Sequence, residues 1–163
     1  MNVELFELSR TIGELAQRQH IKVATAESCT GGLLAATLTH WSGASAWFEC
    51  GVIAYTNEAK KQLLAVPEDI LSMHGAVSEP VAAAMCAGVE SDAVLSITGI
   101  AGPTGGSAEK PVGTVCFGWQ FMDETHTATR SFSGNREAVR IAAAIHALLT
   151  MVKWLREVES KVL

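Results

Sequence analysis

The six residues from Glu27 to Gly32 combine a carboxylate, two hydroxyls, a thiol and two glycines between a strand-like run and an apolar run. A strand that leads through Gly-Gly into a helix leaves free backbone N–H groups near one point, where negative charge is favoured. Acyl transfer requires such donors because an oxyanion develops on the attacked carbonyl. A side chain of this turn could therefore be a nucleophile, with the N–H groups around Thr30, Gly31 and Gly32 holding the oxyanion. Alternatively, Ser28 or Thr30 only caps the following helix.

Cys29 lies in the same turn, but a reactive thiolate needs a nearby base, which is usually a histidine. The five histidines lie outside glycine-rich or motif-like segments, so we interpret them as surface or packing residues. Cys50, Cys86 and Cys116 lie in apolar runs and are expected to be small core residues. No Cys/His pair has metal-ligand spacing, so the sequence predicts no metal site.

A second group with chemical potential is the segment AYTNEAKKQLL, residues 54–64. Tyr55, the only tyrosine, ends a predicted strand, where side chains can face a cleft at the edge of an α/β sheet. Asn57 is expected to cap the next helix and to place Lys60 in its first turn. The helix N-terminus and burial both lower the pKa of a lysine, and a neutral lysine near a serine can act as a general base. Alternatively, Lys60 and Lys61 are ordinary surface residues.

Two further segments could bind an anion. The loop from Gly99 to Gly113 has neither Walker nor dinucleotide-binding spacing, but its length is uncommon without a function. Four of its glycines could present backbone N–H groups to a phosphate: Gly99, Gly102, Gly105 and Gly106. Arg136 and Arg140 share one face at the start of the final helix, where two cations cost stability unless an anion is near. The alternatives are a flexible hairpin connection and a salt bridge to an acidic residue.

The elements that must position these residues alternate between helices and strands, which indicates an α/β layer architecture. Apolar and β-branched runs predict strands over residues 21–28, 47–56, 92–102, 112–121 and 125–133. Amphipathic or capped runs predict helices over residues 1–20, 30–41, 57–66, 67–75 and 78–91, and after Gly134. The last two strands flank a turn at 122–124, so the sheet is expected to be mixed and mostly parallel. We therefore predict a single domain, residues 1–163, with an α/β/α layered fold.

The composition excludes several classes of function. The chain has 163 residues, of which 48% are hydrophobic and 18% charged, enough for one core. Twelve basic against 17 acidic residues give a net charge of −5, without the basic patch of a nucleic-acid-binding protein. Residues 1–20 carry charges throughout, unlike a signal peptide or a membrane span. The sequence thus predicts a cytoplasmic protein that binds neither nucleic acid nor membrane.

Five motifs in order resemble the CinA C-terminal-domain family: TAESCTGG, GVIAYTNEAKKQLLAV, GAVSEPVAAAM, SITGIAGPTGGS with KPVGTV, and SFSGNREAVR. The resemblance covers residues 5 to 155 and is to the stand-alone form of the domain. Characterised members are nicotinamide-nucleotide amidohydrolases, also called nicotinamide mononucleotide deamidases. The resemblance implies an α/β/α fold, a homo-oligomer, and no metal or other cofactor. GPTGG replaces the GPGGG of many relatives, and Thr104 slightly narrows the backbone freedom of the loop.

The resemblance implies hydrolysis of the carboxamide of nicotinamide mononucleotide to nicotinate mononucleotide and ammonia. In that reaction Ser28 is the nucleophile, Lys60 is its base and Tyr55 assists. The glycine-rich loop and Arg140, with Arg136, would bind the ribose phosphate of the pyridine mononucleotide. Two other functions stay open: a nucleotide-binding module without catalysis, and an interaction protein in competence or DNA-damage responses.

Overall fold

The computed structural model describes residues 2–162 and contains one five-stranded sheet in the order β2-β1-β3-β4-β5. Its strands are β1 (Val23–Glu27), β2 (Phe48–Ile53), β3 (Ala93–Gly99), β4 (Thr114–Phe121) and β5 (Glu124–Ser131). β1 pairs in parallel with β2 and β3, whereas β4 pairs antiparallel with β3 and β5. Four of the five strands therefore point the same way and β4 alone is reversed, which confirms the predicted mixed sheet.

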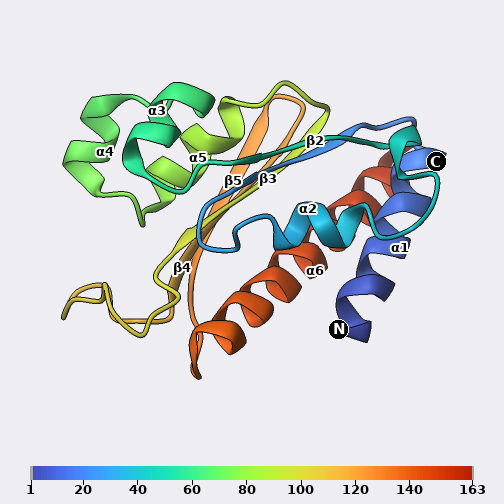
Figure 1. Cartoon of the computed structure of the whole chain (residues 1–163). Helices are drawn as coiled ribbons and strands as arrows, with labels where there is room; N and C mark the ends of the chain where they lie inside the picture. Colours follow the sequence, from blue (N-terminus) through green and yellow to red (C-terminus); the bar gives the residue numbers. More distant parts are fainter. Residues whose placement is uncertain (1, 163) are drawn as a thin grey trace.

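Helices cover both faces of this sheet, as the predicted α/β/α layering requires (Figure 1). One face carries α1 (Val3–Arg18), α2 (Leu33–Leu38) and α6 (Arg136–Val162), and the other carries α3 (Asn57–Leu64), α4 (Glu68–His74) and α5 (Glu79–Ala87). A short 3₁₀ turn, η1 (Ala44–Ala46), precedes β2. Two hydrophobic clusters fill the layers, one on each side of the sheet. The sheet is therefore the shared wall of both cores.

β1 is fully enclosed by the fold, because every one of its residues is buried and it pairs with β2 along one edge and with β3 along the other. Its last residue, Glu27, lies opposite Ile53 of β2 and Ile97 of β3. The carboxyl ends of the three parallel strands consequently meet at one edge of the sheet. Open α/β sheets bind ligands outside this edge, so the segments that follow β1, β2 and β3 are the ones to inspect.

α6 is the one helix within residues 2–162 that is long and apolar enough, by length and composition, to cross a membrane. Its apolar residues are accounted for by the fold, because it packs along the sheet and against α1. The buried face of α6 consists of Val139, Ala143, Ala144, Ala147, Leu148, Met151, Val152 and Leu155. Leu148, Val152 and Leu155 thus lie on one buried face, whereas Ile141 and Ile145 are half-buried at its margin.

Two local predictions are wrong. Asn57 does not cap α3: the side chain of Thr56 accepts the N–H of Ala59 at 3.0 Å, so Asn57 is the first helical residue and Lys60 the fourth. Threonine and asparagine both cap helices well, so sequence alone does not separate neighbours. Cys50 is exposed on the edge strand β2, whereas Cys86 and Cys116 are buried as predicted.

Candidate active site

Ser28 is the first residue beyond β1 and remains tied to the sheet. Its N–H donates to the carbonyl of Ile97 in β3 at 3.0 Å, and its own carbonyl accepts the N–H of Gly31 at 3.0 Å. The turn from Ser28 to Gly31 is thereby closed by backbone hydrogen bonds at both ends. Only 7% of Ser28 is exposed. The hydroxyl therefore lies in a fixed position at the carboxyl edge of the sheet.

Lys60 reaches this hydroxyl from α3. Its Nζ lies 3.0 Å from Ser28 Oγ, 3.2 Å from the carbonyl oxygen of Ala54 and 3.5 Å from that of Tyr55. The lysine is only 2% exposed, although it lies in the first turn of its helix. Lys60 therefore points inward and is not an ordinary surface lysine, whereas Leu63 of the same helix is exposed.

The surroundings of Lys60 favour its neutral form. Desolvation by burial lowers the pKa of Lys60, and the nearby Cys29 thiol opposes this shift weakly. The N-terminal end of α3 adds a further field that disfavours a cation. A neutral amine has two N–H donors and one lone pair. With the N–H groups directed to the carbonyls of Ala54 and Tyr55, the lone pair faces Ser28 Oγ, as a general base for that hydroxyl requires.

Cys29 is the competing nucleophile of the same turn. Its side chain is buried, and desolvation raises the pKa of the thiol to about 11. A thiol with this pKa is almost wholly protonated at neutral pH, and the thiolate is the reactive form. The residue types alone left Ser28 and Cys29 both open, and the surroundings in the fold favour Ser28.

Tyr55 and Arg136 form a polar pair beside this site. Arg136 Nη2 donates to Tyr55 Oη at 2.7 Å, and Arg136 Nη1 donates to the carbonyl of Gly102 at 2.8 Å. The tyrosine ring is 55% exposed. The hydroxyl of Tyr55 is thus engaged by Arg136, and it is the backbone carbonyl of Tyr55 that contacts Lys60.

A cavity of about 230 Å³ lies over Ser28 and Lys60. Its walls come from the segments after β1, β2 and β3, from the loop between α4 and α5, and from the start of α6. The lining residues are Ser28, Cys29, Tyr55, Asn57, Lys60, Ala76, Val77, Thr98, Gly99, Ile100, Ala101, Gly102, Thr104, Gly105 and Arg136. Gly99, Gly102 and Gly105 of the glycine-rich loop therefore face the same space as the serine and the lysine.

Five of the expected binding residues lie outside this lining: Thr30, Gly31, Gly32, Gly106 and Arg140. The N–H of Gly31 is already bonded to Ser28, and a Cβ on Gly106 would lie 2.6 Å from the backbone nitrogen of Val112. Arg140 donates from Nε to the carbonyl of Cys29 at 3.1 Å and from Nη2 to that of Thr30 at 2.8 Å. These residues shape the turn and the loop from outside the cavity.

Two polar lining residues outside the glycine-rich loop are not predicted as site residues by the sequence. Asn57 had been assigned only to the helix cap, and Thr98, whose hydroxyl donates to the carbonyl of Ala76 at 2.9 Å, had no assigned role. The strand-end position of Thr98, next to the glycine-rich loop, was the available signal. Within residues 2–162, no group of three or more His, Cys, Asp or Glu side chains gathers at distances suited to a metal ion.

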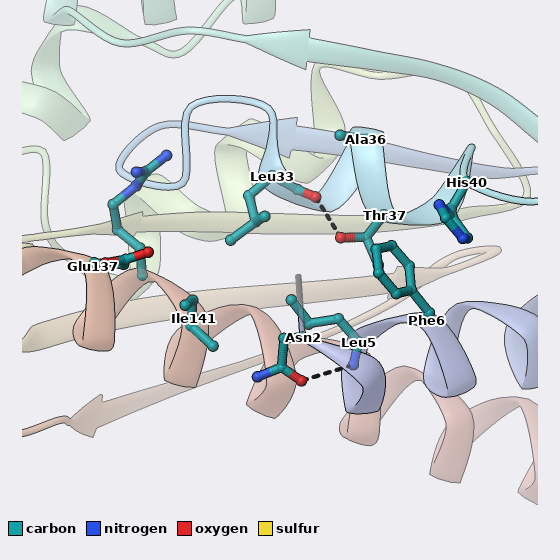
Figure 2. A pocket seen from close by; sticks show the side chains of 10 residues that line it. Asn2, Leu5, Phe6, Leu33, Ala36, Thr37, His40, Glu137 and Ile141 are labelled. Atoms are coloured by element: carbon teal, nitrogen blue, oxygen red, sulfur yellow. Dashed lines mark hydrogen bonds between the residues drawn. The ribbon is translucent and has the colours of Figure 1, made fainter.

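A larger groove of about 570 Å³ lies between α1, α2 and α6 (Figure 2). Leu5, Phe6, Leu33 and Ile141 give it mainly apolar walls, and the ring of His40 stacks on Phe6 at 3.8 Å between centroids. Neither Ser28 nor Lys60 lines this groove. The volume of a hollow therefore does not identify the candidate site, and it is the contact between Ser28 and Lys60 that favours the smaller cavity.

A serine hydroxyl beside a buried lysine is the arrangement that hydrolases of the Ser-Lys class use, and here it lies at the carboxyl edge of an α/β sheet. The chain belongs to the CinA C-terminal domain family, whose model matches residues 5–155. It is 48% identical over 153 residues to the nicotinamide-nucleotide amidohydrolase PncC of Escherichia coli K12, covering 91% of this chain and 93% of that protein. The PncC protein of Enterobacter agglomerans is 49% identical over 154 residues, covering 91% and 94%.

The fold is shared with solved members of the superfamily. The crystal structure of a CinA-superfamily protein from Klebsiella pneumoniae matches with a TM-score of 0.91 and 34% identity, over 96% of this chain and 99% of that one. The predicted family and fold class are therefore confirmed, and the chain is an amidohydrolase-type enzyme by its relatives.

The lowered pKa of Lys60 predicts a pH-dependent contribution to stability. Between that lowered pKa and the ordinary lysine value of about 10.4, the unfolded chain binds more protons at this side chain than the folded chain does. Stability from this group therefore rises with pH. We expect the free energy of unfolding of the wild type, minus that of Lys60→Met, to increase from about pH 7 to about pH 10 in urea titrations.

Lys61→Met is the matched control. Lys61 lies next in the chain, and its contacts with Glu68 and Glu58 raise its pKa, so its stabilisation is already complete at neutral pH and does not grow. A flat difference for Lys60→Met over the same range would contradict the lowered pKa of Lys60.

Proposed function

We propose that this enzyme hydrolyses the carboxamide of nicotinamide mononucleotide, giving nicotinate mononucleotide and ammonia. One observation carries the proposal: Lys60 Nζ lies 3.0 Å from Ser28 Oγ, with the amine almost fully buried. Support comes from relatives at 48–49% identity that carry the name nicotinamide-nucleotide amidohydrolase. An amide carbonyl is the group that a serine nucleophile with an adjacent base attacks.

The reaction proceeds through an ester of Ser28. Neutral Lys60 takes the proton of the Ser28 hydroxyl while Oγ attacks the carboxamide carbon, and the carbonyl oxygen becomes an oxyanion. Collapse of this intermediate breaks the C–N bond, and Lys60 delivers its proton to the departing ammonia. A water molecule then attacks the ester, Lys60 accepts a proton from it, and release of the carboxylate returns that proton to Ser28 Oγ.

The oxyanion needs donors that face the cavity. The residue pattern predicts these donors around Thr30, Gly31 and Gly32, whereas Ser28 and Cys29 are the turn residues that line the cavity. We therefore propose the backbone N–H of Cys29, directly after the nucleophile, as a donor. An N–H at this position contributes to the oxyanion hole in other serine hydrolases. Thr30, Gly31 and Gly32 then act by holding the turn that aims this N–H.

The ribose phosphate is assigned to the glycine-rich loop and Arg136. Arg136 lines the cavity together with Gly99, Gly102 and Gly105. A guanidinium binds phosphate through charge-assisted hydrogen bonds, and exposed Tyr55 Oη can be exchanged for a phosphate oxygen as its partner. Arg140 was the first choice from sequence, but both of its bonded nitrogens hold backbone carbonyls of the turn.

The compartment, assembly and pathway form a separate part of the proposal. We propose a cytoplasmic homo-oligomer that recycles pyridine nucleotides, on the strength of the family resemblance and the acidic sequence, whose net charge is −5. A nucleotide-binding module without catalysis is the alternative. It is disfavoured because a buried lysine without a carboxylate contact costs stability, and catalysis supplies a reason to keep it.

Replacing the nucleophile gives the first test. Purified wild-type protein should release ammonia from nicotinamide mononucleotide, and Ser28→Ala should reduce kcat by at least roughly 1,000-fold, because no covalent intermediate can form. Ammonia is followed by a coupled assay, and circular dichroism verifies the fold. Cys29→Ala is the control and should keep most of its activity. Absence of release by the wild type would refute the proposed reaction, and the reverse ranking of the two variants would make Cys29 the nucleophile.

The pH–rate profile tests the role of Lys60. Because the amine must be neutral to accept the serine proton, kcat should rise by about tenfold per pH unit below the lowered pKa of Lys60 and then level off. The measurement is ammonia release at a series of pH values from about pH 6 to about pH 9. Lys61→Met should leave the profile unchanged. A rate independent of pH over this range would exclude Lys60 as the base.

Arg136→Gln tests phosphate recognition. We expect KM for nicotinamide mononucleotide to rise by roughly tenfold or more while KM for the riboside without phosphate changes little, because only the nucleotide loses a charge-assisted contact. Arg130→Gln is the control, since Arg130 is an exposed arginine on β5 whose side chain donates to the carbonyl of Thr129 and does not line the cavity. Equal effects of Arg136→Gln on both substrates would assign the arginine to the architecture of the loop.

A further inference from the structure

Glu27, the last residue of β1, is a fully buried carboxylate that the proposed reaction does not use. Its Oε1 accepts the hydroxyl of Thr30 at 2.7 Å and the N–H of Leu34 at 2.9 Å. Its Oε2 accepts the N–H of Ala35 at 3.0 Å and lies 3.5 Å from the hydroxyl of Thr25. Both oxygens are therefore occupied by donors from the turn and the helix that follow the nucleophile.

This carboxylate replaces the helix cap that the turn lacks. The N-cap of α2 is Gly32, with φ of 98°, which has no side chain to accept the first N–H groups of the helix. Thr30 does not cap α2, contrary to the sequence-based alternative, because its hydroxyl donates to Glu27. The acceptor for the N–H groups of Leu34 and Ala35 thus comes from the strand before the turn.

We infer that Glu27 is a positioning residue, whose carboxylate fixes the turn from Ser28 to Gly32 and thereby holds Ser28 Oγ against Lys60 Nζ. The inference rests on the proposed function for its kinetic consequence, but the geometry it concerns is independent of the substrate. The side chain of Glu27 is hydrogen-bonded to residues after Ser28, and the backbone of Glu27, directly before Ser28, is paired with β2 and β3. Ser28 lies between these two fixed points.

The same residue also connects to the base. The carbonyl of Glu27 accepts the N–H of Ala54 at 2.8 Å, and the carbonyl of Ala54 accepts a hydrogen bond from Lys60 Nζ at 3.2 Å. Glu27 is thus connected to both residues of the proposed reaction. Its side chain holds the turn that carries Ser28, and its backbone carbonyl bonds Ala54, which in turn contacts Lys60. Loss of the carboxylate would disturb the first connection and leave the second in place.

The surroundings leave the carboxylate no other position. A Cβ on Gly51 of β2 would lie 2.7 Å from Ala35 Cβ and 2.9 Å from Thr25 Oγ1, so the neighbouring strand packs directly against two of the residues that bond Glu27. From the opposite side, Arg140 holds the carbonyls of Cys29 and Thr30. A buried carboxylate is expensive unless its oxygens are hydrogen-bonded, so the position strongly selects one conformation of the turn.

Glu27→Gln is the sharpest substitution, because it keeps the shape but turns one acceptor oxygen into an NH₂ donor that faces other donors. We expect kcat to fall by about 100-fold with KM changed by less than about twofold, since the nucleophile is misplaced while the binding residues are not. The pH dependence of the remaining rate should be unchanged, because Glu27 makes no contact with Lys60 Nζ. A role in stability alone would lower Tm without this separation of kcat from KM.

Glu79→Gln is the matched control. Glu79 also accepts two hydroxyls, those of Thr127 and Thr129 at 2.6 and 2.8 Å, but on the β5 side of α5. It should retain kcat within about twofold when measured well below its Tm. Thr30→Val is the second test variant if Glu27→Gln does not fold. It removes one of the four donors, and a smaller loss in kcat at unchanged KM is expected.

Crystal structures of the wild type and Glu27→Gln give a readout without substrate. We expect Ser28 Oγ and Lys60 Nζ to separate beyond about 3.5 Å in the variant. An unchanged contact, or unchanged kcat in folded Glu27→Gln or Thr30→Val, would overturn the inference. If the wild type releases no ammonia while the contact is lost in the variant, the proposed reaction fails and the positioning role stands.

Discussion

The contact between Lys60 and Ser28 depends on one constraint: the ends of β1 and β2 must lie side by side and in register. Ser28 is the first residue after β1, and Lys60 is the fourth residue of α3, the helix that follows β2. Parallel pairing of the two strands brings their carboxyl ends to one edge, and the pairing of Glu27 with Ile53 fixes the offset. A shift of one residue along β2 would reverse the direction in which its side chains point and move the start of α3. The catalytic geometry is thus a property of the sheet.

The same geometry explains how a serine can be activated without a histidine. A lysine is a poor base at neutral pH unless its ammonium form is destabilised. Here the destabilisation comes from burial, at the N-terminal end of a helix and among backbone carbonyls. Carbonyls accept the N–H groups of a neutral amine but do not supply the full negative charge that would stabilise the cation. Lys61 shows the contrast, because its carboxylate partners Glu58 and Glu68 hold it charged at the surface.

Much of this could be predicted from the sequence, and the failures have physical reasons. The alternation of helices and strands gave the layers, and the late hairpin predicted the reversed strand, because these patterns are local. The motif around Ser28 could be located, but the choice between capping and catalysis depends on residues distant in the chain. Glu27 is the acceptor for the start of α2, and this role is hidden in the sequence because Glu27 precedes Leu34, whose N–H it accepts, by seven residues. Arg136 and Arg140 are one turn apart, so only tertiary packing separates a cavity-facing arginine from one that holds the turn.

The glycine-rich loop after β3 supplies several residues of the cavity lining, whereas Ser28 and Lys60 come from the segments after β1 and β2. The loop connects two neighbouring antiparallel strands and contributes no residue to the Ser28–Lys60 contact. Its sequence and length can therefore diverge without disturbing bond cleavage. A change in this loop would therefore reshape one wall of the cavity while the sheet continues to hold Ser28 and Lys60 in place.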